Sequence, residues 1–329
     1  MPEIIGRNIE VGLGVEKVRG TSQLTAEKWV KNVTANIVEK AEHAIDDNSH
    51  GVLEDSDNRR VVRKWIEGNL EGIAHADVVG YLFYNLYGGV TSSVVAGVVY
   101  SHLFELAQTI QHNSLTVFAK DGAVQQLSYD NGMVGTLEIN ASVNDYVRFT
   151  SGFMAKEANS NADTPSYDTE YDFISRDITV KVADTEAGLS SADATKIKDL
   201  SVTFDNGLIA DQVLGSYSPD DIYNSKFSIE GSFSRNFDDT TFKDLFLADT
   251  SKYMEITIEG AVDIGGANHP SITLVLNKVK IMNWDRSGGN DELVTETIDF
   301  KAFYNETDGE ASKLTLQNLT AEYSTPISD

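Results

Sequence analysis

The sequence contains no cysteine among its 329 residues. This absence excludes a disulfide framework and a thiolate metal site, and it leaves the redox compartment open. The first residues, MPEIIGRNIEVGLG, contain no basic segment followed by a long apolar run, so we expect no secretory signal. Neither a stapled secreted scaffold nor a zinc module is therefore expected.

Catalytic signatures are also missing. No GxSxG, HExxH, GxxxxGK[ST] or GxGxxG pattern occurs, and the six histidines show no ligand spacing with carboxylates. None of the acidic clusters at 54–58, 218–224, 236–244 and 285–291 matches the twelve-residue calcium loop, so they are interpreted as turns and helix caps. We predict no cofactor, no metal and no enzymatic activity, although an acidic pair of the glycosidase kind stays open as an alternative.

Long uncharged runs are limited to one segment, Val78 to Glu105, in which only the last residue is charged. Its length would span a bilayer, but Gly88-Gly89 and the polar residues after it divide the segment. We expect a short helix followed by a short strand, and no membrane partner.

Basic residues are scarce, because 26 Lys and Arg stand against 51 Asp and Glu, a formal net charge of -25. Such a charge disfavours binding to anionic lipid or gripping of the DNA backbone. Both halves of the chain are acidic, so the charge does not come from an acidic tail.

Two segments of the chain are similar in sequence. FSIEGSFSRNFDDTTFKDLF from Phe227 resembles KWIEGNLEGIAHADVVGYLF from Lys64. Further weak matches keep the same order: RNIEV with RDITV, VKNVTANIVE with IKDLSVTFDN, SLTVFAK with SITLVLN, and Asn144-Asp145 with Asn290-Asp291. This pattern predicts one module built twice, in residues 1–162 and 163–329, with a polar linker from Lys156 to Asp172.

Each module alternates apolar and polar residues with the period of a strand, as in FSIEGSFS. Behind Asp77 and behind Asp238-Asp239, apolar residues fall at helical spacing, so each module also has one short helix with an acidic start. The predicted class is mainly β. Further strands are expected at 94–100, 115–119, 136–139, 146–153, 253–258, 272–281 and 293–303.

The motif from Phe227 to Phe246, followed by SITLVLNKVKIMNWDRSGGNDELVTETIDFKAFYN and LTLQN, resembles the C-terminal part of major tail tube proteins of long-tailed bacteriophages. HLFELAQTIQHNSLTVFAKDG and NDYVRFTSGFMAKEA are similar to a second version of the same pattern. The resemblance implies tandem β-sandwich or barrel modules, each flanked by a helix, in rings that stack into a hollow tube for genome delivery.

Two modules in one chain imply three chains per ring with pseudo-sixfold symmetry, and a hexameric ring is the alternative. The implied partners are other copies of the chain, a tape measure protein and transient phage DNA in the lumen, and tail tip and tail terminator proteins. The implied location is the phage tail of the virion, after synthesis in the host bacterial cytoplasm.

Two sets of residues are candidates for assembly. Glu67, Glu71 and Glu230 are on the polar side of the matched strands and are expected to face the lumen, where carboxylates repel phosphates and let DNA slide. The loops Lys40 to Asp57 and Gly207 to Asn224 are expected to reach the next ring. Their candidate residues are Glu42, Asp46, Asp55, Tyr217, Asp220 and Asp221.

A competing interpretation is a tandem β-sandwich binding module, such as an adhesin or a carbohydrate-binding protein of a tail tip or surface layer. Exposed Trp29, Trp65 and Trp284 would then stack on sugars. A binding module would stay a soluble monomer and retain a ligand.

Overall fold

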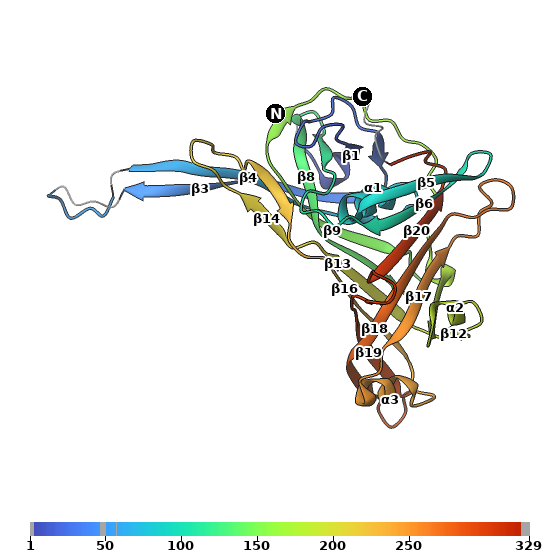
Figure 1. The fold of residues 1–329 in the computed structure, drawn as a ribbon. Helices are drawn as coiled ribbons and strands as arrows, with labels where there is room; N and C mark the ends of the chain where they lie inside the picture. Colours follow the sequence, from blue (N-terminus) through green and yellow to red (C-terminus); the bar gives the residue numbers. More distant parts are fainter. Residues whose placement is uncertain (1–2, 47–50, 57, 324–329) are drawn as a thin grey trace.

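The computed structural model describes residues 3–46, 51–56 and 58–323, and these residues form mainly antiparallel β-structure (Figure 1). The N-terminal half contains β1 (Ile9–Val15), β2 (Lys28–Val30), β3 (Val33–Asp46), β4 (Asn58–Ile73), helix α1 (Val79–Tyr87), β5 (Gly88–Ala96), β6 (Val99–Leu106), β7 (Leu115–Asp121), β8 (Gln125–Ser142), β9 (Arg148–Ala155) and β10 (Ala158–Ser160).

The C-terminal half contains β11 (Ile178–Ala183), helix α2 (Glu186–Leu189), β12 (Ala194–Thr195), β13 (Asp199–Asp205), β14 (Leu208–Asp211), β15 (Asp221–Asn224), β16 (Ser228–Asn236), helix α3 (Thr241–Ala248), β17 (Lys252–Glu259), β18 (Ser271–Ser287), β19 (Thr295–Ala302) and β20 (Ser312–Asn318). The predicted mainly β class is confirmed. The one-turn helix α2 was not expected.

Both halves pair their strands in the same order. The N-terminal order is β1–β7–β8–β9–β4–β3, and the C-terminal order is β11–β17–β18–β19–β16–β13. The irregularities also correspond. In β7 the register against β8 shifts between Leu115 and Val117, and in β17 the register against β18 shifts between Lys252 and Met254. A second shift follows Val134 in β8 and Ile281 in β18. A β-bulge bends the strand that contains it. Because the bulges are at corresponding positions, both halves bend in the same places.

The pairing corrects one sequence match. SLTVFAK was matched with SITLVLN, which equates β7 with β18. By pairing order, β17 occupies the place of β7, while β18 occupies the place of β8. The match was misleading because alternating apolar residues recur in every half-buried strand and do not identify which strand they belong to.

The shared IEG motif has a packing role in both halves. A Cβ atom on Gly68 would lie 2.5 Å from the ring of Phe153, and one on Gly231 would lie 2.5 Å from the ring of Phe300. In each case the aromatic ring belongs to the strand paired with the motif, β9 or β19. Glycine is therefore needed where a neighbouring phenylalanine crosses the strand.

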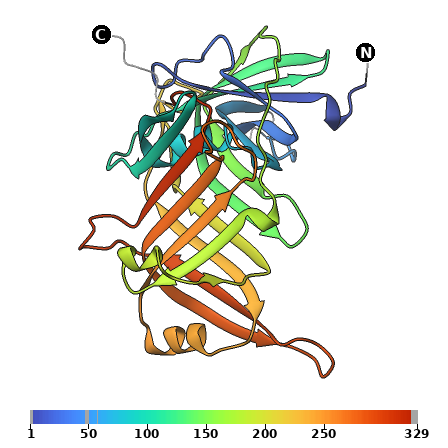
Figure 2. The same ribbon diagram turned by 90° about the vertical axis from the view of Figure 1, so that its right-hand side faces the viewer.

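The two halves share one sheet. Residues 136–142 of β8 pair with β13 in register, and β20 pairs with β6 of the hairpin that follows α1 (Figure 2). Helix α1 is buried along its whole length, whereas α3 buries only Phe242. The core therefore continues from one half into the other, and α1 lies close to its middle.

Several expected boundaries differ. The strand expected at 94–100 contains the turn between β5 and β6, because Gly97 has a positive φ of 58°. Of the two acidic helix starts, Asp239 accepts the Thr241 amide at 2.8 Å, while Asp77 accepts the hydroxyl of Thr320 instead. The linker region from 156 to 172 contains β10 and otherwise lacks regular structure, and its Asp163 accepts the Trp29 indole N–H at 3.3 Å.

Candidate functional site

A polar sheet face crosses both halves of the molecule. β3, β4, β9 and β8 continue through the β8–β13 junction into β13, β16, β19 and β18. One row of directly opposed residues runs across these strands: Thr34, Glu71, Thr150, Glu138, Thr203, Glu230, Lys301 and Lys280. Because residues in one register row point to the same side of a sheet, this row defines a single face, called here the polar face.

The three predicted lumen residues lie on this face. Glu71 and Glu230 belong to the row, and Glu67 is four residues before Glu71 on the same strand; all three are exposed. Lys301 pairs with Glu230 at 2.6 Å, and Lys40 lies 3.9 Å from Glu67. The structure thus brings residues from strands β4 and β16, far apart in the sequence, onto one surface.

Carboxylates dominate the polar face. The register rows place Glu67, Glu71, Glu138, Asp199, Asp205, Glu230, Asp285 and Asp299 on it. The cations on the same face are Lys40, Arg63, Arg148, Lys280 and Lys301, and Arg63 lies opposite a further carboxylate, Glu42. The face is hollowed around Thr136, Thr203, Glu230 and Lys301. The face carries a net negative charge and is hollowed in the part that β13, β16 and β19 form.

The sheet carrying this face has two open edges. Within the described residues, β3 pairs only with β4, and residues 280–287 of β18 pair only with β19. Their backbone amide and carbonyl groups along the outer side are therefore available for pairing with another chain. By pairing order, β13 corresponds to β3 and the end of β8 corresponds to the end of β18. These two strands pair with each other inside the chain.

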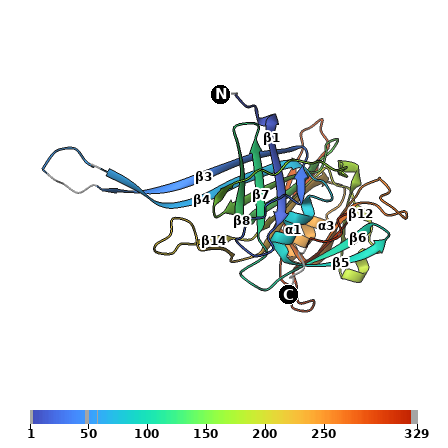
Figure 3. The ribbon, with the colours of Figure 1, turned by 90° about the horizontal axis from the view of Figure 1, so that it is seen from above.

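The first predicted loop is largely a strand. Residues 40–46 continue β3, and together with β4 they form a long hairpin arm that extends away from the body (Figures 1 and 3). Glu42 and Asp46 lie on this arm, while Asp55 is exposed in the connection between the strands. The stretch reads as a loop in sequence because its residues are exposed on both faces and lack the alternation of a half-buried strand.

The second predicted loop contains the hairpin β14–β15. Tyr217 is 61% exposed, and its carbonyl accepts the Lys64 amide at 2.7 Å. The Asp220 carbonyl accepts the ammonium group of Lys156 at 3.0 Å. Asp221 differs from the others, because its side chain is only 13% exposed and pairs with Arg19 at 3.0 Å within the chain.

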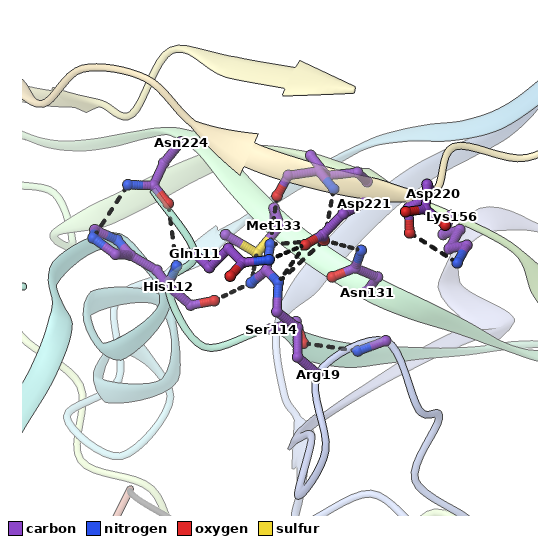
Figure 4. A network of polar contacts seen from close by, with 12 residues as sticks. Arg19, Gln111, His112, Ser114, Asn131, Met133, Lys156, Asp220, Asp221 and Asn224 are labelled. Carbon is purple, nitrogen blue, oxygen red and sulfur yellow. Dashed lines mark hydrogen bonds and ion pairs between the residues drawn. The ribbon is translucent and has the colours of Figure 1, made fainter. Parts of the chain in front are cut away.

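The Arg19–Asp221 pair is the centre of a polar network between the halves (Figure 4). Arg19 also donates to the backbone carbonyls of His112 and Ile222. Asp221 accepts from Asn131 and Gln111, each at 2.8 Å. These contacts hold β15 against the N-terminal half, and they engage the carboxylate of Asp221, a predicted stacking residue, within its own chain.

Burial and hydrogen bonding oppose each other in this network. Burial alone would raise the pKa of Asp221, but the hydrogen bonds from Arg19, Asn131 and Gln111 outweigh it and lower the pKa. Glu16 shows the reverse balance: burial raises its pKa although Ser114 and the amides of Asn131 and Gly20 donate to it. The hydrogen bonds therefore favour the charged form of Asp221, which pairs with Arg19.

Sequence reasoning did not identify Arg19. The residue is 202 positions away from Asp221, and nothing near either one marks the pair. Only the docking of the β14–β15 hairpin brings them together.

The three tryptophans are engaged within the protein. Trp29 is 3% exposed, so its expected exposure was wrong. Trp65 is half-buried and donates to Glu67 at 2.8 Å, while half-buried Trp284 donates to Glu296 at 2.6 Å. None of them presents a free ring and N–H in the manner of a sugar-stacking platform.

The described residues were also compared with the requirements of a metal site and of a membrane-spanning helix. Over residues 3–46, 51–56 and 58–323, no three His, Asp or Glu side chains gather in a way that could hold a metal ion. Within the same ranges, no helix combines the length and the apolar character needed to cross a bilayer.

The comparisons with known proteins identify one family. A family model described as phage tail tube protein matches residues 6–302. No curated protein matches the chain. Among solved structures, the chain is similar to a hybrid solid-state NMR and cryo EM structure of the SPP1 tail tube, with 10% identity, a TM-score of 0.28, and coverage of 45% of this chain and 81% of that chain. A likeness this distant carries no weight for function, so the assignment depends on the family model.

Proposed function

Because this chain belongs to the family of phage tail tube proteins, we propose that its copies close into rings and that these rings stack as the conduit for genome delivery. Membership makes it a structural component of the phage tail, as its resemblance implied. The ring geometry, the lumen surface and the stacking contacts belong to the proposal.

The chain is proposed to carry two copies of one tail tube module. The identical pairing order and the two corresponding bulges in each half support this duplication. Three chains would then supply six modules, giving a ring with pseudo-sixfold symmetry. A ring of six chains is the alternative. A closed ring leaves no sheet edge exposed.

The junction inside the chain supplies the template for the junction between chains. Within the chain, Thr203 of β13 lies opposite Glu138 of β8. The corresponding residues by pairing order are Val38 of β3 and Asp285 of β18, which lie on the open edges. Antiparallel pairing of β3 with residues 283–287 of a neighbouring copy would continue the polar face around the ring. The β8–β13 junction within the chain is the observation that carries the proposal.

The polar face is proposed to line the lumen, with Glu67, Glu71 and Glu230 among its carboxylates. Its hollowed part and its net negative charge support this assignment. A wall without excess cations does not release counterions from DNA, so a passing duplex is not retained. The tape measure protein would fill the same space before DNA does.

Stacking is proposed to involve the exposed ends of the two hairpins, with Glu42, Asp46, Asp55, Tyr217 and Asp220 as candidates. Their position at the end of the sheet opposite the β8–β9 and β18–β19 turns supports contact with an adjoining ring. Tail tip and terminator proteins would bind the two ends of the stack. Synthesis is proposed in the host cytoplasm.

Negative-stain electron microscopy over a concentration series tests the ring. Rotationally averaged end views should show six lobes around a hole, and native mass spectrometry of released rings should give three chains. Six chains per ring would favour the alternative stoichiometry. A protein that stays monomeric at every concentration, also in the presence of a tail tip complex, would contradict the proposal.

A further inference from the structure

Within the described residues, the outer part of the β3–β4 arm pairs with no third strand. Its distal part, residues 41–46 and 58–63, extends away from the body beyond the hydrogen bond from the Lys64 amide to the Tyr217 carbonyl (Figures 1 and 3). Ile45 is 64% exposed and Val62 is 45% exposed, so apolar side chains on the arm face solvent. A two-stranded hairpin alone is marginally stable in water. The arm therefore requires a surface that its own chain does not supply.

The C-terminal half shows what an equivalent segment does when a surface is available. The segment between β13 and β16 corresponds in place to the arm between β3 and β4. It forms the β14–β15 hairpin, which folds onto the N-terminal half through Arg19, His112 and Asn131. The same position in the module thus gives a docked hairpin in one half and an extended arm in the other.

We propose that the arm docks on the C-terminal half of a neighbouring copy, on the surface that corresponds to the one holding β14–β15 within the chain. This inference depends on the ring proposed above, because pairing of β3 with the neighbour's β18 brings the arm to that half. The occupant of the surface is a second copy of this chain.

The pairing order identifies the residues on both sides. Asp221 precedes Ile229 by as many positions as Asn58 precedes Ile66, so residues 58–61 of the arm correspond to β15. On the receiving side, His112 precedes the bulge residue Leu115 by as many positions as Asp249 precedes Lys252. The neighbour's surface therefore centres on Asp249 and includes the connection that follows β11.

The charges complement each other with reversed sign. Within the chain the body contributes the cation, Arg19, and the hairpin contributes the anion, Asp221. Between copies the arm contributes Arg59 and Arg60, next to Arg63 and Lys64, in a protein of net charge -25. The receiving surface contributes Asp184 and Asp249, whose side chains are 84% and 78% exposed although each also pairs with a lysine of its own chain, Lys252 or Lys280. Their outer sides stay open to the arm. Opposite potentials on two surfaces favour their association and set its register.

A charge swap tests the docking. The variant Arg59→Glu/Arg60→Glu should raise the protein concentration needed for tube formation by about tenfold, as expected when several charge pairs at an interface become repulsive. Adding Asp184→Lys/Asp249→Lys to the same chain should restore assembly. The matched control, Arg7→Glu/Arg176→Glu, changes the net charge equally at exposed positions away from the arm and should assemble at the concentration of the unmodified protein.

A cysteine pair separates this inference from the ring proposal. The chain has no cysteine, so Val38→Cys/Asp285→Cys gives an unambiguous crosslink if β3 pairs with a neighbour's β18. Opposed residues in antiparallel strands have the Cα separation that a disulfide requires. Crosslinked rings together with normal assembly of the Arg59→Glu/Arg60→Glu variant would overturn the arm docking alone. Absence of both the crosslink and rings would overturn the ring, and the docking with it.

Discussion

Gly80 of helix α1 faces the ring of Tyr323, the last residue that the structure describes. A Cβ atom on Gly80 would lie 2.0 Å from Cζ of Tyr323. Tyr323 is 1% exposed, donates its hydroxyl proton to the Asp77 carbonyl at 2.9 Å, and packs edge-on against Tyr81 with ring centroids 5.1 Å apart. The ring has little room to move.

The variant Gly80→Ala therefore has two opposed effects. Displacing the buried ring should cost about 3 kcal/mol, at the upper end of the range for overpacked cores. Replacing glycine by alanine in a helix returns about 0.5–1 kcal/mol. The free energy of unfolding should fall by about 2 kcal/mol in the presence of Tyr323.

The effect of Gly80→Ala on the free energy of unfolding should change sign when the Tyr323 ring is removed. Tyr323→Ala alone should cost about 3–5 kcal/mol, because a large buried aromatic side chain is lost. In that background Gly80→Ala should raise the free energy of unfolding by about 0.5–1 kcal/mol, since only the helix effect remains. The coupling energy of this double-mutant cycle is then about 3 kcal/mol, within the range measured for residues in direct contact.

Urea unfolding of dilute, unassembled protein measures each variant by linear extrapolation. Tyr323→Phe provides a control, because the ring stays and Gly80→Ala should remain destabilising. If Gly80→Ala lowers the stability equally with and without the ring, the steric reasoning is refuted.

Three further changes test other parts of the structure. Arg19→Met should lower the free energy of unfolding by about 3 kcal/mol at neutral pH, because it leaves Asp221 without its cation. The folded-state pKa of Asp221 is lowered, so this difference is fully present above the usual pKa of an aspartate and should disappear as the pH falls through the folded-state value. Urea unfolding at several pH values would detect the change. Phe233→Ala, at a side chain that is 0% exposed, should cost about 3–5 kcal/mol in the same assay, and a loss below 1 kcal/mol would contradict its place in the core. Glu71→Lys/Glu230→Lys should leave tube assembly intact but slow DNA ejection from reconstituted phage in a salt-dependent manner, whereas unchanged ejection would argue against a lumenal position of these residues.

Some features of the fold follow from local sequence alone. The alternation in FSIEGSFS predicted β16 with Ile229 inward and Glu230 outward, and both are found. The helical spacing after Asp77 predicted α1. The place of Glu67, Glu71 and Glu230 on a polar face could also be predicted, because one-sided burial of a strand fixes the side of every residue along it.

Other features could not be predicted in this way. Residues 40–46 have no inward face, so no alternation marks them as a strand, and only their pairing with β4 shows it. The match of β7 with β18 failed for a related reason, because similar alternation fits any half-buried strand.

The sequence by itself determined that this protein is built of half-buried strands with one polar side, since a period of two is a local property of the backbone and its side chains. It also determined the family, through the order of those patterns along the chain. The tertiary structure decided which strands meet and therefore which polar residues share a surface. The Arg19–Asp221 pair, the Gly80–Tyr323 contact and the polar face across the β8–β13 junction all join residues distant in sequence. Such contacts depend on how strands pair and close over one core, and local periodicity contains no information about that choice.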